Sequence, residues 1–142
     1  MNAETVHKIS NESKEPNWFL AKRLSALKHF QELPMLKLKY GLGIMINIDF
    51  LKLEEINPLD YQDDIIIVQD NNVKIINFKE AQGADLELIK DYFMTKCVSP
   101  NENKISAMHA TFVNKGFLIH VPENTAVEAP IIINIDLKSK SS

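Results

Sequence analysis

The sequence contains little cysteine, little glycine and no long apolar run. Among its 142 residues are one cysteine, Cys97, and four glycines. A single thiol excludes an internal disulfide and favours a reducing compartment. The N-terminal segment is polar and shows no signal peptide, and no apolar run approaches the ~20 residues that cross a bilayer. We therefore expect a cytoplasmic protein with no membrane segment.

The chain also lacks an excess of positive charge. Its formal net charge is −3, with 16 Lys and Arg against 19 Asp and Glu. Nonspecific nucleic-acid binding needs a basic surface that neutralises phosphates, so this balance argues against a nucleic-acid partner. Hydrophobic residues make up 45% of the chain, which is ordinary for one globular domain whose core needs no metal or disulfide.

Sequence motifs for nucleotide or metal chemistry are missing. The segment Gly41-Leu42-Gly43 is not followed by the Gly-Lys-Ser/Thr of a phosphate-binding loop. Neither a Cys-x-x-Cys nor a His-Glu-x-x-His pattern occurs. The sequence accordingly predicts no catalytic residue, no metal ligand and no cofactor, and it identifies no cofactor-binding residue.

Three side chains are the candidates for reactive or metal-binding chemistry: Cys97, His109 and His120. Cys97 is either a reactive thiol or metal ligand or, as we prefer, a half-buried residue at a helix end, since a free cysteine usually behaves as a small hydrophobe. His109 lies in an apolar segment, and we interpret it as a hydrogen-bonded or surface histidine. His120 shares its strand face with Leu118, and we expect that face to be the wetter one.

Two groups of charged residues allow a second interpretation. Asp63 and Asp64 suggest a metal site, but no third carboxylate is fixed nearby, and we interpret them as a solvated pair at the start of a strand. Lys22, Arg23 and Lys28 are either a partner-binding set or, as we prefer, the solvated face of a helix.

Hydrophobic periodicity predicts an α+β fold. Leu20, Leu24 and Leu27 recur at helical spacing and predict a helix over 16–33, which Pro34 ends. We also expect helices near 84–96 and 103–114, and the second helix is capped by Asn101 or Asn103 and ended by Gly116. The strands that we expect are one within Ile44–Phe50, a hairpin near 64–78 that turns at 70–72, and two paired strands within 116–136.

The predicted core combines apolar residues of these helices and strands. Its members are Leu20, Leu24, Leu27, Ile66, Val68, Ile75, Leu88, Phe93, Phe112, Ile119 and Ile132. Residues 1–15 are polar, and we interpret them as a flexible arm or a weak helix.

Two separated stretches carry more specific patterns. Glu15 to Met35 reads EPNWFLAKRLSALKHFQELPM, and Lys104 to Ile135 reads KISAMHATFVNKGFLIHVPENTAVEAPIIINI. The first is similar to the N-terminal signature of the SufB/SufD family of iron–sulfur cluster assembly scaffolds, which has Glu-Pro-x-Trp, then Arg-Leu-x-Ala-Leu, then Leu-Pro-Met. The second resembles the family's helix, Lys-Gly turn and strand ending in Val-Pro. With the strand and acidic helix between them, the resemblance covers most of residues 15–137.

The sequence departs from the family pattern at three places. His109 stands where the family usually has Asn, Glu123-Asn124 replaces a common Lys-Gly, and Leu36 stands where a second Pro is frequent. By resemblance, the later parts of family members form a right-handed parallel β-helix, bind a SufC-type ATPase, pair SufB with SufD, and carry the Cys and His that receive sulfur. No position here matches those residues, so we carry none over.

The resemblance implies four parts of the chain. They are a flexible arm over 1–15, an N-terminal α+β domain over 16–115, the first strands of a truncated β-helix over 116–137, and a tail over 138–142. We expect either a fragment or a short relative, without a catalytic role, and self-association into a homodimer through exposed strands.

Three functions remain open from the sequence. The first is a non-catalytic domain of a SufB/SufD-like subunit in the SUF system. The second is a free-standing protein–protein interaction module with no cluster role. The third is a small enzyme or metal-binding protein that uses Cys97, His109 and His120, which we rank last because their spacings fit no defined site.

Overall fold

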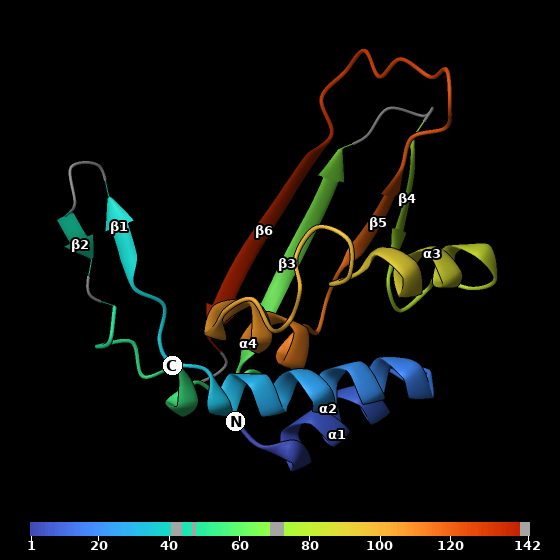
Figure 1. Cartoon of the computed structure of the whole chain (residues 1–142). Helices are drawn as coiled ribbons and strands as arrows, with labels where there is room; N and C mark the ends of the chain where they lie inside the picture. Colours follow the sequence, from blue (N-terminus) through green and yellow to red (C-terminus); the bar gives the residue numbers. More distant parts are fainter. Residues whose placement is uncertain (41–43, 47, 69–72, 140–142) are drawn as a thin grey trace.

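The computed structural model describes residues 1–40, 44–46, 48–68 and 73–139. These residues form helices at one end of the molecule and antiparallel strands that rise from them (Figure 1). In chain order the elements are α1 (Ala3–Glu12), α2 (Asn17–Glu32), β1 (Leu38–Tyr40), β2 (Ile44–Ile46), a 3-10 turn (Leu53–Glu55), β3 (Tyr61–Val68), β4 (Lys74–Asn77), α3 (Ala84–Tyr92), α4 (Lys104–Phe112), β5 (Phe117–His120) and β6 (Ile132–Ser139). Among the described helices, none has both the length and the apolar character of a membrane span.

Helix α1 is the second of the two alternatives, a flexible arm or a weak helix, that the sequence left open for residues 1–15. The Asn2 side chain accepts a hydrogen bond from the Thr5 backbone N–H at 3.0 Å and so caps the helix. Val6 and Ile9 point to one side and are fully buried against the other helices. The segment is polar on average, but two apolar residues three positions apart suffice when a neighbouring helix covers them.

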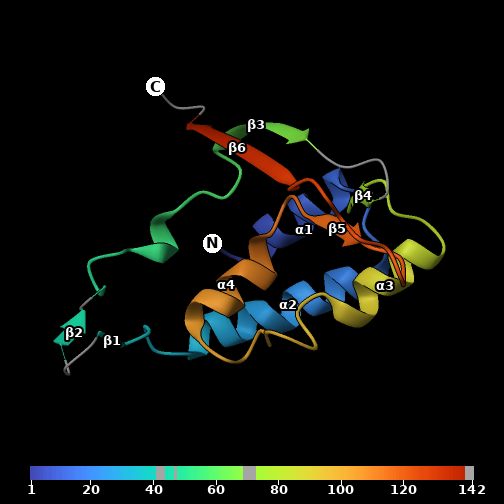
Figure 2. The ribbon, with the colours of Figure 1, turned by 90° about the horizontal axis from the view of Figure 1, so that it is seen from above.

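Helix α2 confirms the helix predicted over 16–33. It begins after Pro16, whose carbonyl accepts a hydrogen bond from the Phe19 N–H at 2.9 Å. It ends at Glu32, and the next residue, Leu33, has an extended backbone because Pro34 follows. Figure 2 shows α2 and α4 lying against each other, and their contact forms the centre of the helical part.

Helices α3 and α4 are both shorter than the sequence predicted. Helix α3 ends at Tyr92, with Phe93 in an extended conformation. Helix α4 begins after Asn103, whose side-chain oxygen accepts from the N–H groups of Ile105 and Ser106 at 3.0 Å. The expected C-terminal role of Gly116 is wrong, because the helix already ends at Phe112.

The strands pair differently from the prediction. Strand β3 pairs with β6, and β4 pairs with β5, in two separate antiparallel ladders (Figure 1). We predicted a hairpin near 64–78 and a terminal strand pair within 116–136, and both predictions are wrong. Each strand of the first segment, β3 or β4, pairs with a strand of the second segment, β6 or β5. The turn predicted at 70–72 lies outside the described residues.

The described ladders confirm the α+β class but contain no parallel pairing. Strand β2 lies within the predicted Ile44–Phe50 segment and pairs with β1 in a third antiparallel ladder. This small hairpin projects away from the rest of the molecule, as both views show (Figures 1 and 2).

The hydrophobic core has two parts. The first lies between α1, α2 and α4 and contains Val6, Ile9, Leu27, Phe30, Leu53, Ala107 and Phe112. The second lies where the start of α2 meets α3 and the β4–β5 ladder, and it is built around Phe19, Ala81 and Ile89. Ile76 and Leu118, which face each other across that ladder, pack on the second part.

The predicted core is largely correct for the helices and wrong for most of the strand residues. Leu27 and Phe112 are buried, while Leu20, Leu24 and Phe93 pack partly buried against the two core parts. Ile66, Ile119 and Ile132 are exposed, Ile75 and Leu88 are only half-buried, and the side chain of Val68 lies outside the description. A two-stranded antiparallel ladder can pack one face on the core and leave the other face in solvent. The presence of β-branched residues therefore does not show which face is buried.

Candidate functional site

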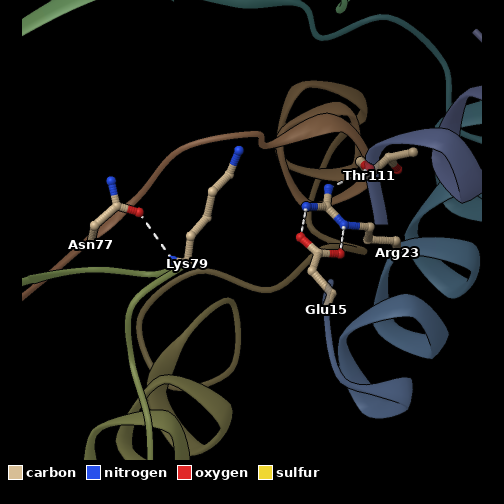
Figure 3. A network of polar contacts seen from close by, with 5 residues as sticks. All are labelled: Glu15, Arg23, Asn77, Lys79 and Thr111. Atoms are coloured by element: carbon tan, nitrogen blue, oxygen red, sulfur yellow. Dashed lines mark hydrogen bonds and ion pairs between the residues drawn. The ribbon is translucent and has the colours of Figure 1, made fainter. Parts of the chain in front are cut away.

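A buried ion pair lies at the junction of α1, α2 and α4. The Arg23 side chain is 1% exposed, and its Nε and Nη2 donate to the two carboxylate oxygens of Glu15 at 2.8 and 2.5 Å. Its Nη1 donates to the carbonyl of Thr111 at 2.9 Å. Figure 3 shows the three groups converging from different segments. We call these three residues the Arg23 network.

Local structure brings Glu15 to this position. At the end of α1, Lys14 adopts a left-handed backbone with φ of 51°, and the N–H of Glu15 bonds to the carbonyl of Ser10 at 3.0 Å. This turn places Glu15 just before Pro16 and α2. Arg23 lies on the second turn of α2, and its guanidinium stacks over the Phe19 ring at 4.8 Å.

The Arg23 network corrects the interpretation of Arg23 as part of a solvated face. A buried guanidinium is tolerated only when paired and hydrogen-bonded, and a planar fork suits a bidentate carboxylate. Among the described residues, no buried side-chain nitrogen or oxygen lacks a partner. The sequence shows the charge but not the carboxylate eight positions away that neutralises it.

Two lysines make similar contacts with helix ends. Lys22 donates to the carbonyl of Phe93, just after α3, at 2.6 Å, and its burial lowers its pKa. Lys104 donates to the carbonyl of Phe30, in the last turn of α2, at 2.9 Å. With Arg23, these cations satisfy carbonyls that have no partner within their own helix, where the helix dipole favours positive charge.

Lys104 also fixes the 3-10 turn. Its ammonium lies 2.9 Å from a carboxylate oxygen of Glu54 and 4.7 Å from the centre of the Phe30 ring. The hydrogen bond from Lys104 holds the pKa of Glu54 below its ordinary value. Sequence reasoning missed this contact because the two residues are far apart along the chain.

A cavity of about 220 Å³ lies beside the Arg23 network. It is formed by the α1–α2 turn, the segment after β4, helix α3 and the linker from α4 to β5. Its apolar wall consists of Pro16, Phe19, Phe78, Ala81, Leu86, Ile89 and Val113. Lys14, Lys79 and Lys115 also line it, and Figure 3 shows Lys79 extended on the side of Glu15 and Arg23.

The three sequence candidates lie on different segments. Cys97 is exposed beyond the end of α3, which corrects the expectation of a half-buried residue. His109 lies on α4 and is exposed, in agreement with the interpretation as a surface histidine; its ring is 6.1 Å from that of Phe93, and partial burial lowers its pKa. His120 is exposed, as expected, but Leu118 on the same face packs on the core.

Metal ligation finds no support among the residues that the structure describes. No group of three His, Cys, Asp or Glu side chains there is placed to hold a metal ion. Asp64 is exposed and lies 3.2 Å from the ammonium of Lys138, and the side chain of Asp63 is outside the description. Lys28 is exposed, as the solvated-face interpretation requires, and pairs with Glu32 at 3.9 Å.

Comparison with known proteins relates this arrangement to one family. Residues 35–133 match the family model described as the SufBD protein N-terminal region. The chain is 25% identical to the iron–sulfur cluster assembly protein SufD of Bacillus subtilis, over 92% of this chain and 38% of that protein. It is 27% identical to an iron–sulfur cluster assembly SufBD family protein of Staphylococcus saprophyticus, over 89% of this chain and 36% of that protein.

The matches cover most of this chain but less than two fifths of these relatives. The family model takes in both core-forming helices of the second half, α3 and α4, and strands β3, β4 and β5. The Glu15–Met35 stretch lies almost wholly before it. The resemblance predicted from the sequence is confirmed, and the chain belongs to the SufBD protein N-terminal region family.

Proposed function

We propose that this chain is a non-catalytic domain of a SufB/SufD-like subunit and acts in iron–sulfur cluster assembly by the SUF system. The family match is the observation that carries the proposal, since both curated relatives are named for this process. The partners that we propose are SufB/SufD-type subunits and a SufC-type ATPase.

The use of the buried charged groups supports a structural role. Arg23, Lys22 and Lys104 all donate to backbone carbonyls at helix ends and so fix the helices to one another. A general acid or nucleophile has to face a space where substrate can bind. Lys22 and Lys104 connect helices to one another, and Arg23, which also lines the cavity of about 220 Å³, is hydrogen-bonded to Glu15 and to the Thr111 carbonyl.

One face of the β3–β6 ladder supports the attachment of further strands. Ile65 lies opposite Ile135, and Ile67 opposite Ile133, so four isoleucines share that face. Ile135 is 56% exposed. We propose that this face and the neighbouring strand edges receive the β-helical part of a SufB/SufD-like subunit, or a second copy of the chain.

The opposite face of the same ladder supplies a matched control. It carries Ile66, which is 62% exposed, and Ile132, which is 44% exposed, but its other neighbours include Asp64, Asn134 and Asp136. Substitution of Ile135 or of Ile66 by lysine adds the same charge at similar exposure on opposite faces. Only the first change places a charge on the face of the four isoleucines.

Affinity capture tests the proposal. The tagged chain, Ile135→Lys and Ile66→Lys are each incubated with purified SufB/SufD-type and SufC-type subunits. We expect the parent chain and Ile66→Lys to retain these subunits and Ile135→Lys to release them. Absence of any retention by the folded parent chain, together with capture of clients unrelated to cluster assembly, supports instead an interaction module with no cluster role.

A further inference from the structure

The cavity beside the Arg23 network has a composition that this network does not require. Its wall is apolar. Among the described residues that line it, three are lysines with exposed side chains and one, Glu15, carries a carboxylate. We propose that the cavity binds a small organic anion with a flat apolar body, such as an aromatic carboxylate. This ligand site is independent of the proposed assembly role.

The volume and the wall fit an aromatic ring. A dry apolar cavity of about 150 Å³ lined by Leu, Ile and Phe is known to bind benzene, and this cavity measures about 220 Å³. The rings of Phe19 and Phe78 form part of the wall and both pack against Phe93, at 5.5 and 5.3 Å between centroids. Aromatic side chains that are held in this way offer a fixed apolar surface for a ring.

The charges around the cavity favour an anion. Glu15 is occupied by the bidentate contact with Arg23. Within the described part of the chain, no carboxylate forms an ion pair with Lys14 or Lys79, both of which are exposed. The whole chain has a net charge of −3, so this local excess of lysine contrasts with the rest of the molecule.

The walls are fixed before any ligand binds. A side-chain carbon on Gly116 would lie 2.6 Å from the Phe78 ring, so the linker and the ring are already in close contact. The Phe78 N–H also bonds to the Gly116 carbonyl at 2.9 Å. The hydrogen bonds of the Arg23 network fix the positions of Glu15 and Arg23, which also line the cavity. A preformed cavity loses little entropy on binding, which favours small ligands.

Titration of the ¹⁵N-labelled chain tests the site with three probes that share a phenyl ring. Benzoate is anionic, benzyl alcohol neutral and benzylamine cationic. We expect benzoate to shift the amide signals of Lys14, Lys79 and Gly116 and to bind about fivefold more tightly than benzyl alcohol, as two exposed charge contacts imply. Benzylamine is expected to bind more weakly than either.

Two lysine substitutions separate charge from folding. Lys14→Gly removes a charge and places glycine at a left-handed position, so it is expected to preserve stability while weakening benzoate binding about twofold to threefold. Lys79→Gln is expected to have the same effect. Lys28→Gln, on the exposed side of α2, is the control and is expected to leave the affinity unchanged.

A cavity-filling change supplies the second measurement. Ala81→Leu adds apolar volume to the wall and is expected to abolish the shifts caused by all three probes while the protein stays folded. Equal binding of the three probes, or benzoate shifts that persist in Lys14→Gly and Lys79→Gln at unchanged affinity, would overturn the proposal. So would the absence of shifts at the cavity amides at millimolar benzoate.

Discussion

The Arg23 network is the contact whose loss should affect the fold most. Glu15→Gln keeps the shape of the side chain and removes its charge. Arg23 is 1% exposed and the Glu15 side chain 12% exposed, so little water can reach the guanidinium in place of the missing carboxylate. The guanidinium then remains buried without a counter-charge beside the Phe19 ring and the Thr111 carbonyl.

The expected cost follows from this burial. Removal of one partner from a buried ion pair costs about 3–5 kcal/mol, whereas loss of an exposed pair costs about 0–1 kcal/mol. Small domains are stable by about 5–15 kcal/mol. With a denaturant slope of about 2 kcal/mol per M urea, a loss of about 4 kcal/mol lowers the unfolding midpoint by about 2 M.

Urea unfolding followed by the fluorescence of Trp18, the single tryptophan, measures this loss. The double variant Glu15→Gln with Arg23→Met removes both charges and should recover a large part of the stability, because an apolar replacement of a whole buried pair is often near neutral. A loss below about 1 kcal/mol in Glu15→Gln, or no recovery in the double variant, would refute the reasoning.

Three further changes test other contacts, each by the free energy of unfolding. Partial burial lowers the pKa of His109 from 6.5. Protonation is therefore disfavoured in the folded state, and stability falls as the pH drops from 6.5 toward the lowered pKa. His109→Asn should reduce the loss of stability between pH 7.5 and 5, and an unchanged profile would contradict this. The hydrogen bond from Lys104 lowers the pKa of Glu54 from 4.5. The parent protein should therefore be more stable than Glu54→Gln above pH 4.5, and this difference should shrink as the pH falls through the lowered pKa. A difference that grows in acid would contradict the role of this hydrogen bond. Gly116→Ala places a carbon 2.6 Å from the Phe78 ring and should cost about 1–3 kcal/mol, whereas a neutral effect would show that the ring yields freely.

The sequence predicted the helices well because their signals are local. The stripe of Leu20, Leu24 and Leu27 and the stop at Pro34 define α2 within one or two residues. Asn103 carries the capping geometry that the sequence indicated for α4. For residues 1–15 the sequence indicated a helix only as an alternative to a flexible arm, because the apolar residues of α1 are few and their burial depends on α2 and α4.

Pairing and burial of distant residues were not predictable in the same way. The run Ile65–Val68 has the composition of a strand, but nothing local shows that β6, far along the chain, is its partner. Arg23 appeared as one charge among several, because its buried state depends on Glu15 and on the carbonyl of Thr111. The cavity depends on four segments and has no sequence signal of its own.

Grafting tests the proposed role most directly. Residues 1–142 replace the matching N-terminal segment of the SufD relative in cells that lack that protein's own copy, and the activity of an iron–sulfur enzyme is measured. The account predicts that the graft restores activity, that a graft with Ile66→Lys does so too, and that a graft with Ile135→Lys does not. Failure of a parent graft that accumulates to normal levels, or restoration of activity by the ungrafted chain alone, would contradict a role as one domain of a SufB/SufD-like subunit.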